Sequence, residues 1–262
     1  MSEAPARRMP VLFIGHGSPM NAISDNAYRR SWQALGPKLP RPDAILCVSA
    51  HWLTRGTAVT TGFPLETIHD FYGFPQALYD EEYPVPDART FAQAAIHAVH
   101  STRVVADGEW GLDHGAWAVL KPMYPAGEIP VFQVSIDATQ PPRRHVELGR
   151  ELATLRDRGV LIVASGNIVH NLALMRPGRV PYDWAVEFDT HVARALEQRD
   201  DQALVDYLRL GRAAELAVNS AEHYLPLLYA AGARSADDTL EFFNEAIDMG
   251  SISMRSVTFG GR

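Results

Sequence analysis

Continuous apolar runs alternate with amphipathic stretches along this chain. The clearest runs cover residues 11–14, 44–48 and 160–164, and each is followed by small or polar residues. Short apolar runs bounded by turn-forming residues are typical of strands that are buried on both faces. Apolar residues recur at helical spacing over residues 26–35 and 88–99. The alternation predicts an α/β layered fold with helices on both faces of the sheet.

The remaining segments extend the same pattern. Further strands are expected at residues 58–61, 103–106, 129–136 and 251–259, and further helices at residues 118–123, 145–156, 185–198, 203–210 and 221–230. The run at 129–136 is predicted to be a central strand. Because no repeat, low-complexity tract or long charged linker divides the chain, we expect a single domain over residues 1–262.

Two of the apolar runs end in a histidine. His16 follows the first run between Gly15 and Gly17, and His51 follows the second run. In open α/β sheets, ligands bind beyond the carboxyl ends of the strands, so these two histidines are placed to face one crevice. The pattern indicates a metal site at the strand ends, and two unrelated loop histidines remain the alternative.

Three more of the ten histidines have an unusual setting. His114 lies in a glycine- and tryptophan-rich segment, and His170 follows the strongest predicted strand. His223 lies near the start of a predicted helix, where Asn219 and Glu222 have the spacing of a capping box. That interpretation gives Glu222 a structural role and leaves His223 available as a ligand. Neutral imidazole is a common ligand of iron and zinc.

Composition excludes several classes of function. The formal net charge of −7 argues against a protein that binds nucleic acid through broad phosphate neutralisation. No apolar stretch approaches the roughly 20 residues of a membrane span, and no signal-type segment is found, so we expect a cytoplasmic location. The single cysteine, Cys47, rules out a disulfide within the chain and a cysteine-rich metal site.

Seven motifs in one order resemble a known family over nearly the whole chain. They are Gly15–Met20 (GHGSPM), Ser49–Trp52 (SAHW), Asp70–Pro75 (DFYGFP), Leu112–Trp117 (LDHGAW), Ser165–Asn171 (SGNIVHN), Glu222–Leu227 (EHYLPL) and Gly250–Ser256 (GSISMRS). The chain resembles the class III extradiol ring-cleaving dioxygenases, in the 4,5-DOPA dioxygenase branch.

The resemblance implies a three-layer α/β/α fold with a central mixed sheet and an active site at the carboxyl ends of the strands. It also implies one divalent metal per chain, with Fe(II) expected for activity, although an all-histidine site suits Zn(II) as well. His16 and His51 match two ligands, and the third is Glu222 or His223, of which the capping argument favours His223. His170 is expected to be a fourth ligand or the catalytic acid–base.

The expected reaction inserts O2 into a catechol ring of the DOPA type to give a muconic semialdehyde. By family pattern, His114 contacts the substrate and dioxygen. Trp52, Tyr72 and Trp117 could form an apolar wall for the ring, and plain core packing is the alternative. A zinc hydrolase that uses a metal-bound water is the alternative function. The expected partners are a small catechol and O2, without nucleic acid or membrane, and the chain is expected to be a monomer or small homo-oligomer.

Overall fold

A mixed sheet lies at the centre of the computed structural model, which describes residues 8–178 and 180–260. Within those residues the sheet has six strands in the order β6-β2-β8-β1-β12-β9. Their bounds are Val11–Gly15 (β1), Ala44–Ser49 (β2), Val131–Gln133 (β6), Val160–Gly166 (β8), Thr239–Phe243 (β9) and Ser256–Gly260 (β12). The pairs from β6 to β1 are parallel, whereas β12 and β9 pair antiparallel.

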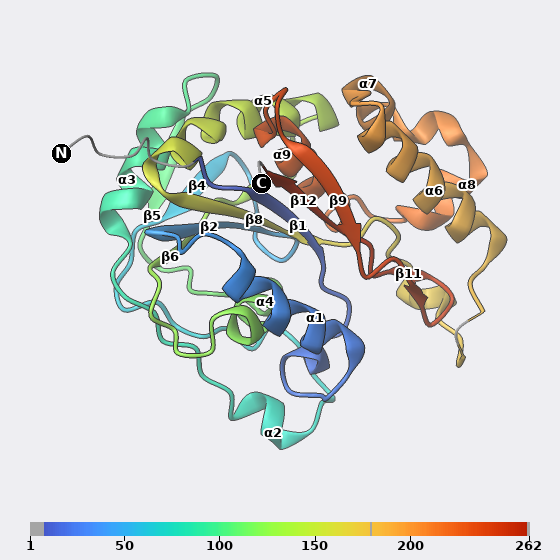
Figure 1. Cartoon of the computed structure of the whole chain (residues 1–262), viewed down its shortest axis with the longest axis horizontal. Coiled ribbons are helices and arrows are strands. Elements are labelled where there is room, and N and C mark those ends of the chain that lie inside the picture. Colours follow the sequence, from blue (N-terminus) through green and yellow to red (C-terminus); the bar gives the residue numbers. More distant parts are fainter. Residues whose placement is uncertain (1–7, 179, 261–262) are drawn as a thin grey trace.

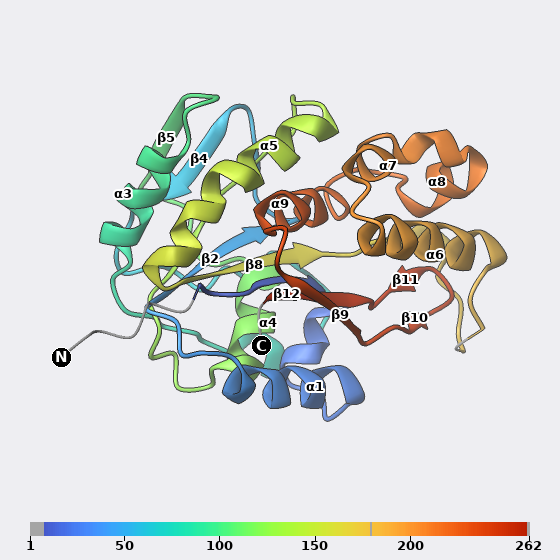
Figure 2. The same ribbon diagram turned by 45° about the horizontal axis from the view of Figure 1, so that its top comes forward.

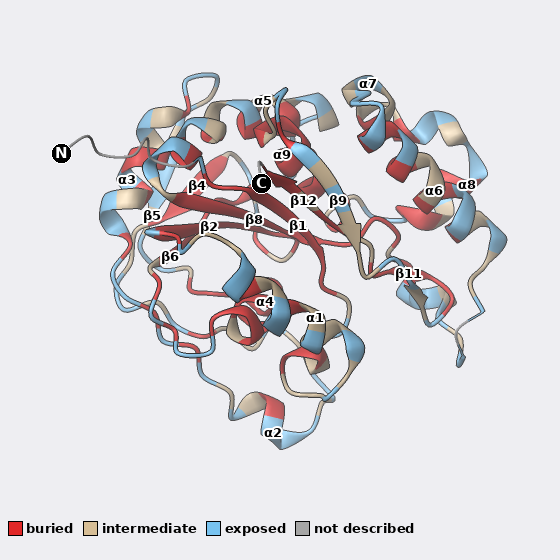
Figure 3. Cartoon of the chain, in the orientation of Figure 1, coloured by how far each residue is buried: buried red, intermediate tan, exposed pale blue. Residues whose placement is uncertain are grey.

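The central strands are apolar on both faces because both faces are covered. Successive side chains of a strand point to opposite sides. Accordingly Val11 and Phe13 belong to one buried cluster, and Leu12 and Ile14 belong to the other. Figure 3 shows the strands buried between the two helical layers. This arrangement confirms the predicted three-layer α/β/α fold with a mixed sheet.

Helices form the two outer layers (Figures 1 and 2). On one side of the sheet lie α3 (Arg89–Ala98), α5 (Pro142–Leu152), α6 (Asp183–Glu197), α7 (Asp201–Val205), α8 (Arg212–Ala217) and α9 (Leu225–Ala233). On the other side lie α1 (Ala27–Leu35) and α4 (His114–Met123), and a short α2 (Gln76–Tyr79) extends below them. Helix α9 is buried along its whole length and packs on β8, β1 and β2.

Short elements complete the fold. Three two-stranded sheets pair β3 (Leu53–Thr54) with β7 (Ile136–Asp137), β4 (Thr57–Thr60) with β5 (Val104–Asp107), and β10 (Ile247–Asp248) with β11 (Ile252–Ser253) in the described part of the chain. The 3-10 helices are η1 (Pro19–Ala22), η2 (Gly36–Lys38), η3 (Ala153–Arg158), η4 (Leu172–Leu174) and η5 (Tyr207–Leu210).

Several predicted elements differ from the structure. The predicted helix 203–210 is divided into α7 and η5, and the predicted strand 251–259 is divided into β11 and β12, which belong to different sheets. The run 129–136 is not a central strand: β6 is the edge strand, and the chain leaves the sheet before β7. It looked central because α3 and β4 bury this edge as fully as the middle of the sheet. The predicted helix 221–230 begins only at Leu225, with Tyr224 rather than Asn219 at its N-cap. Glu222 therefore does not form the predicted capping box, and it accepts a hydrogen bond from Ser220 Oγ at 2.6 Å.

The register of the parallel strands sets the position of the site. Gly15 of β1 is opposite Gly166 of β8, and Ser49 of β2 is opposite Ser165. Three parallel strands therefore end at the same level of the sheet. The segments that follow them leave the sheet side by side, at the edge where ligands bind in open α/β folds.

His145 is buried outside the group of strand-end histidines, and we expect it to make the stability of the fold depend on pH. Burial lowers the pKa of His145 to about 4, and its Nε2 atom has no hydrogen-bond partner. Its pKa in the unfolded chain is about 6.5, so the unfolded chain binds the extra proton as the pH falls below that value. As the pH falls from 7 to 5, the free energy of unfolding is expected to decrease by about 2 kcal/mol, because the buried ring stays neutral while the unfolded chain gains a proton.

Urea unfolding of the wild type and His145→Gln at pH 7 and pH 5 measures this contribution. The variant is expected to lose less stability than the wild type over that interval. The exposed His97 provides the matched control, and His97→Gln is expected to keep the wild-type pH dependence. Equal losses in the wild type and His145→Gln would contradict the assignment.

Candidate metal centre

Three histidine rings form a nearly equilateral triangle beyond the strand ends. His16 directly follows β1, His51 follows β2, and His223 precedes α9. The ring centres of His16 and His51 are 5.3 Å apart, and the ring of His223 lies 5.1 Å from each. His223 is more than 170 positions away from His16 and from His51 in the chain, and the fold brings the three together.

Two further histidines flank this triangle. His114 is the first residue of α4, and its ring centre lies 3.8 Å from that of His51. His170 follows β8 and stacks in parallel on His223, with ring centres 3.5 Å apart. All five histidines that the sequence singled out therefore line one cavity.

The carboxylate of Asp70 contacts two of the rings, those of His51 and His114. Its Oδ1 atom accepts hydrogen bonds from the backbone N–H and from Nδ1 of His114, both at 2.9 Å, and its Oδ2 atom lies 3.2 Å from Nδ1 of His51. Burial alone would raise the pKa of Asp70, but the hydrogen bonds from His114 and His51 outweigh it and lower that pKa. A carboxylate in this position fixes the tautomer of both rings and leaves their Nε2 atoms free of protons.

Residues at and after the end of β8 contact the other two residues of the triangle, His16 and His223. Nδ1 of His16 lies 2.9 Å from Ser165 Oγ, and its Nε2 lies 3.4 Å from Nε2 of His51. The carbonyl oxygen of His223 accepts a hydrogen bond from Asn167 N–H at 2.8 Å. Nδ1 of His223 is buried without a hydrogen-bond partner, and Glu222 Oε1 lies 3.5 Å from it.

Burial keeps three of these rings, those of His16, His170 and His223, neutral. It is the largest cause that lowers the pKa of His16 and of His223, and the neighbouring histidines lower both further. Burial also lowers the pKa of His170, to about 4. Neutral imidazoles with free ring nitrogens are the form that binds metal ions and accepts protons.

Two adjacent groups of side chains could hold a metal ion. His16, His51 and His114 form one group, and His170, Glu222 and His223 form the other, with the donor atoms of each group within 4.8 Å of one another. The groups meet at the triangle, since His223 lies between His16 and His170. The donor set, an orphaned buried imidazole nitrogen among others, fits a divalent transition metal.

A buried network of hydrogen bonds links the backbone of His51 to Asp113. The backbone N–H of His51 donates to Ser49 Oγ at 3.2 Å, and Ser49 Oγ donates to Asp113 Oδ1 at 2.5 Å. Asp113 is also the N-cap of α4, where it accepts from Ala116 N–H at 3.2 Å. The helix that carries His114 and the strand end that carries His51 thus share one carboxylate.

A cavity of about 620 Å³ opens above the histidines. Its walls are mostly apolar, with Phe71 and Phe74 on one side and Leu172, Met175 and Ile252 among the residues on the other. Pockets of this size and polarity suit a single-ring aromatic ligand. The cavity therefore combines the ring nitrogens of the histidines with a mostly apolar wall.

The structure does not bring the three predicted substrate contacts to this cavity. Trp52 is buried and stacks on Trp110, with ring centres 5.7 Å apart. Trp117 is buried and donates from Nε1 to the carbonyl oxygen of Ile68. Tyr72 is 92% exposed. Core packing, the alternative reading of Trp52 and Trp117, is what the structure shows for them.

The sequence did not predict that Phe71 and Phe74 line the cavity. Phe71 and Phe74 belong to the same aromatic motif as Tyr72, and the alternation of exposed and inward positions in this loop was not readable from its composition. Asp70 was visible as the acidic residue of that motif. Its contacts with His51 and His114 depend on three segments that meet only in the fold.

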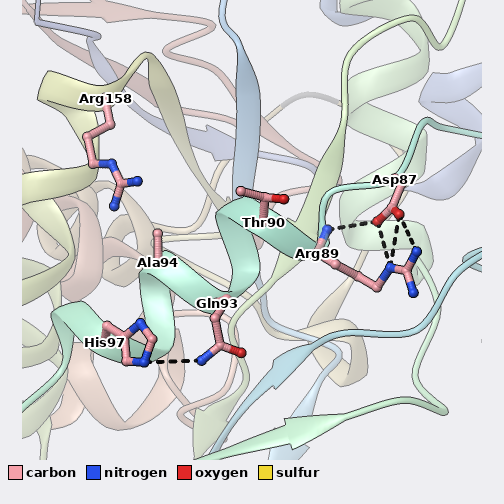
Figure 4. Close-up of a pocket in the computed structure, with 7 residues that line it drawn as sticks. All are labelled: Asp87, Arg89, Thr90, Gln93, Ala94, His97 and Arg158. Atoms are coloured by element: carbon pink, nitrogen blue, oxygen red, sulfur yellow. Dashed lines mark hydrogen bonds and ion pairs between the residues drawn. The ribbon is translucent and has the colours of Figure 1, made fainter.

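A second groove, of about 600 Å³, lies on α3 and is more open. Figure 4 shows its residues: Asp87, Arg89, Thr90, Gln93, Ala94, His97 and Arg158. The Arg89 guanidinium is bound by Asp87, and the His97 ring contacts Gln93. Among the described histidines, His97 alone lines this groove, whereas five line the histidine cavity. The histidine cavity is therefore the better candidate for a metal site.

Comparison with known proteins identifies the family. Residues 11–260 match the family described as the catalytic LigB subunit of aromatic ring-opening dioxygenase. The chain belongs to this family. The family, the mixed α/β fold and the class of activity predicted from the seven motifs are thereby confirmed: the chain is an extradiol ring-opening dioxygenase. The alternative zinc hydrolase receives no support from the match.

Individual relatives cover nearly the whole chain. The chain is 49% identical to "4,5-DOPA dioxygenase extradiol" of Escherichia coli K12, over 97% of this chain and 95% of the relative. It is 36% identical to the protein of the same name from Beta vulgaris, over 95% and 96%. A crystal structure of an uncharacterized protein from Escherichia coli K12 matches with a TM-score of 0.84 and 46% identity, over 97% of this chain and 100% of that one.

Among the residues that the structure describes, no helix has the length and apolar character needed to cross a bilayer. The LigB family and its relatives imply a non-haem metal site, in agreement with the histidine cluster at the strand ends.

Gly115 provides a test of how tightly the centre is packed. A Cβ atom at Gly115 would lie 2.3 Å from Ser49 Oγ and 2.9 Å from His51 Cδ2. In an exposed helix, Gly→Ala stabilises by about 1 kcal/mol, but Gly115→Ala is expected to destabilise by about 1–3 kcal/mol because the site is already full. Urea unfolding measures the sign. Gly108→Ala, where no atom lies within 4 Å, is the control; a stabilised Gly115→Ala would refute the tight packing.

Proposed function

We propose that this chain cleaves the ring of a DOPA-type catechol next to one of its hydroxyl groups, using O2 and one divalent metal held by His16, His51 and His223. The observation that supports the ligand set is the triangle of rings with centres 5.1–5.3 Å apart. Imidazoles that share one ion at about 2.1 Å have ring centres roughly 5 Å apart.

The nature of the anchoring contacts supports the same set. Ser165 holds Nδ1 of His16 and Asp70 holds Nδ1 of His51, so both rings present Nε2 toward the common centre. Such outer contacts orient ligands and raise their basicity. Fe(II) is the ion expected for activity, and Zn(II) is expected to occupy the same site. A bound Fe(II) would lower the pKa of catechol hydroxyls and provide redox chemistry, which Zn(II) lacks.

His170 is proposed as the base that accepts a catechol proton. Its ring lines the cavity, and none of the described residues forms a hydrogen bond with it. Its lowered pKa, about 4, keeps the ring neutral and able to accept a proton at neutral pH. The parallel stack on His223 places this base beside a proposed ligand, where a bound hydroxyl would lie.

His114 is proposed as the group that stabilises developing negative charge on oxygen or returns a proton. Nδ1 of His114 donates to Asp70, so the carboxylate stabilises the ring when it carries a positive charge. Groups with this role typically contribute ~10²–10⁴-fold to the rate.

Phe71 and Phe74 are proposed to hold the aromatic ring of the substrate. Both line the cavity on the side of His114, and the ring centre of Phe71 lies 5.6 Å from that of His114. Aromatic pairs favour such edge-to-face and offset contacts. The name of the Escherichia coli and Beta vulgaris relatives supports a DOPA-like catechol as the substrate.

The overall reaction balances without an external reductant. One carbon–carbon bond of the ring breaks beside a hydroxyl-bearing carbon, and both atoms of O2 enter the product. The product is a muconic semialdehyde, which carries one new carboxylate and one new aldehyde. The catechol itself supplies the electrons that reduce O2.

Oxygen consumption by the iron-loaded protein tests the proposed activity. The metal-free protein is loaded with Fe(II) without air and then mixed with DOPA and air. We expect a yellow product and uptake of about one O2 per catechol, since both oxygen atoms are incorporated. The zinc-loaded protein is expected to consume none, because Zn(II) has no redox chemistry. Absence of O2 uptake over a panel of catechols, together with hydrolysis by the zinc form, would establish the alternative hydrolase.

Alanine variants separate metal binding from turnover. His16→Ala, His51→Ala and His223→Ala are expected to lose the metal on dialysis, as measured by elemental analysis. His114→Ala is expected to keep the metal and lose about 10²–10⁴-fold in kcat. Glu222→Gln is the matched control for His223 and is expected to keep the metal. Equal metal retention in all five variants would overturn the ligand assignment, and loss in Glu222→Gln together with retention in His223→Ala would transfer the third position to Glu222.

A further inference from the structure

A half-buried carboxylate lies at the cavity wall without a partner. Asp248 is part of the lining, and no described residue forms an ion pair with it. Its Oδ1 atom accepts one hydrogen bond, from the backbone N–H of Met249 at 3.1 Å. The other acid of the lining, Asp70, is occupied by His51 and His114. Asp248 is therefore the acidic group of the described lining that is free to bind a ligand.

The surroundings of Asp248 increase the effect of its charge. No arginine or lysine is among the described residues that line the cavity, and the neighbouring residues Met175, Met249 and Ile252 are apolar. An apolar wall lowers the local dielectric constant, so a charge in it interacts more strongly with a ligand than a charge in open water.

The nearest arginines on these segments have other partners. The guanidinium of Arg176 donates to the carbonyl oxygens of Val180 and Pro181 and lies 3.9 Å above the ring of Tyr182. Arg255 pairs with Asp189 and Glu245. Neither cation neutralises Asp248.

The backbone fixes Asp248 in place. It lies in the β10–β11 hairpin opposite Ile252, and Ile252 forms a β-bridge with His170. The turn after it places Met249 at φ 49° and Gly250 at φ 79°. A left-handed methionine is costly and persists only where surrounding contacts impose it. The carboxylate is thus held at a set position relative to the histidine that stacks on His223.

We propose that Asp248 binds the ammonium group of an amine-bearing catechol, so that the cavity prefers catechols with a cationic side chain over neutral or anionic ones. The proposal rests on the proposed function, because the catechol oxygens would point to the histidines while the side chain reaches the wall. Asp248 is then a residue that determines specificity, and the chemistry remains with the histidines.

Three catechols of similar size test the preference in the iron-loaded enzyme. Dopamine is the cation, 4-ethylcatechol is the neutral probe and 3,4-dihydroxyphenylacetate is the anion. The wild type is expected to show the highest kcat/KM with dopamine and the lowest with the acid. Added salt is expected to reduce the difference, because the pair is partly exposed.

Asp248→Asn removes the charge and keeps an acceptor for the Met249 N–H. It is expected to lower kcat/KM for dopamine about tenfold, which corresponds to about 1.4 kcal/mol. The value for 4-ethylcatechol is expected to stay within twofold, and the value for the acid is expected to rise. Asp237→Asn removes an exposed carboxylate just before β9, at the other end of that strand from the hairpin, and is the control for net charge. Asp248→Ser, a smaller acceptor, replaces Asp248→Asn if thermal unfolding shows that the latter is not folded.

Binding to the zinc-loaded protein separates this proposal from the proposed function. Calorimetry in the absence of air is expected to give an Asp248-dependent Kd for dopamine but not for 4-ethylcatechol, whether or not any catechol is turned over. If no catechol is cleaved and the binding difference persists, ring opening fails and the ammonium site stands. An equal effect of Asp248→Asn on all three probes, or a wild-type preference for the acid, would overturn the ammonium site.

Discussion

The parallel, in-register pairing of β1, β8 and β2 is the constraint on which the site depends. Because Gly15 is opposite Gly166 and Ser49 is opposite Ser165, the three strands end at one level. Each strand end then delivers a histidine or the loop that carries one. A shift of one residue would turn every side chain of a strand to the other face, so the two buried clusters that cover the sheet also hold the histidines in place.

Asp70 shows how one carboxylate organises part of a buried cluster of histidines. Burial lowers the pKa of His16, His170 and His223. Asp70 contacts Nδ1 of His51 and Nδ1 of His114, so the Nε2 atoms of these rings are left free. In the proposed function, the same contacts prepare a metal site and leave a histidine–carboxylate pair for proton chemistry.

In the proposed function, separate parts of the chain contribute to recognition of the substrate. Phe71 and Phe74 come from the aromatic loop, the histidines come from the strand ends, and Asp248 comes from a hairpin near the carboxyl terminus. Placing a charged group at the wall and the reactive groups at the floor lets specificity change without disturbing the centre. A hairpin that bridges to His170 couples the two parts through the backbone.

The sequence by itself determined the buried strands, the histidines at their ends and the family, because these are properties of local runs and motifs. Only the tertiary structure decided the edge position of residues 129–136, the start of the last helix at Leu225, and which aromatic side chains line the cavity, namely Phe71 and Phe74. Burial at an edge looks the same in sequence as burial at the centre. Which side of a loop faces a cavity depends on segments far away in the chain, and so does the pairing of Asp70 with two histidines.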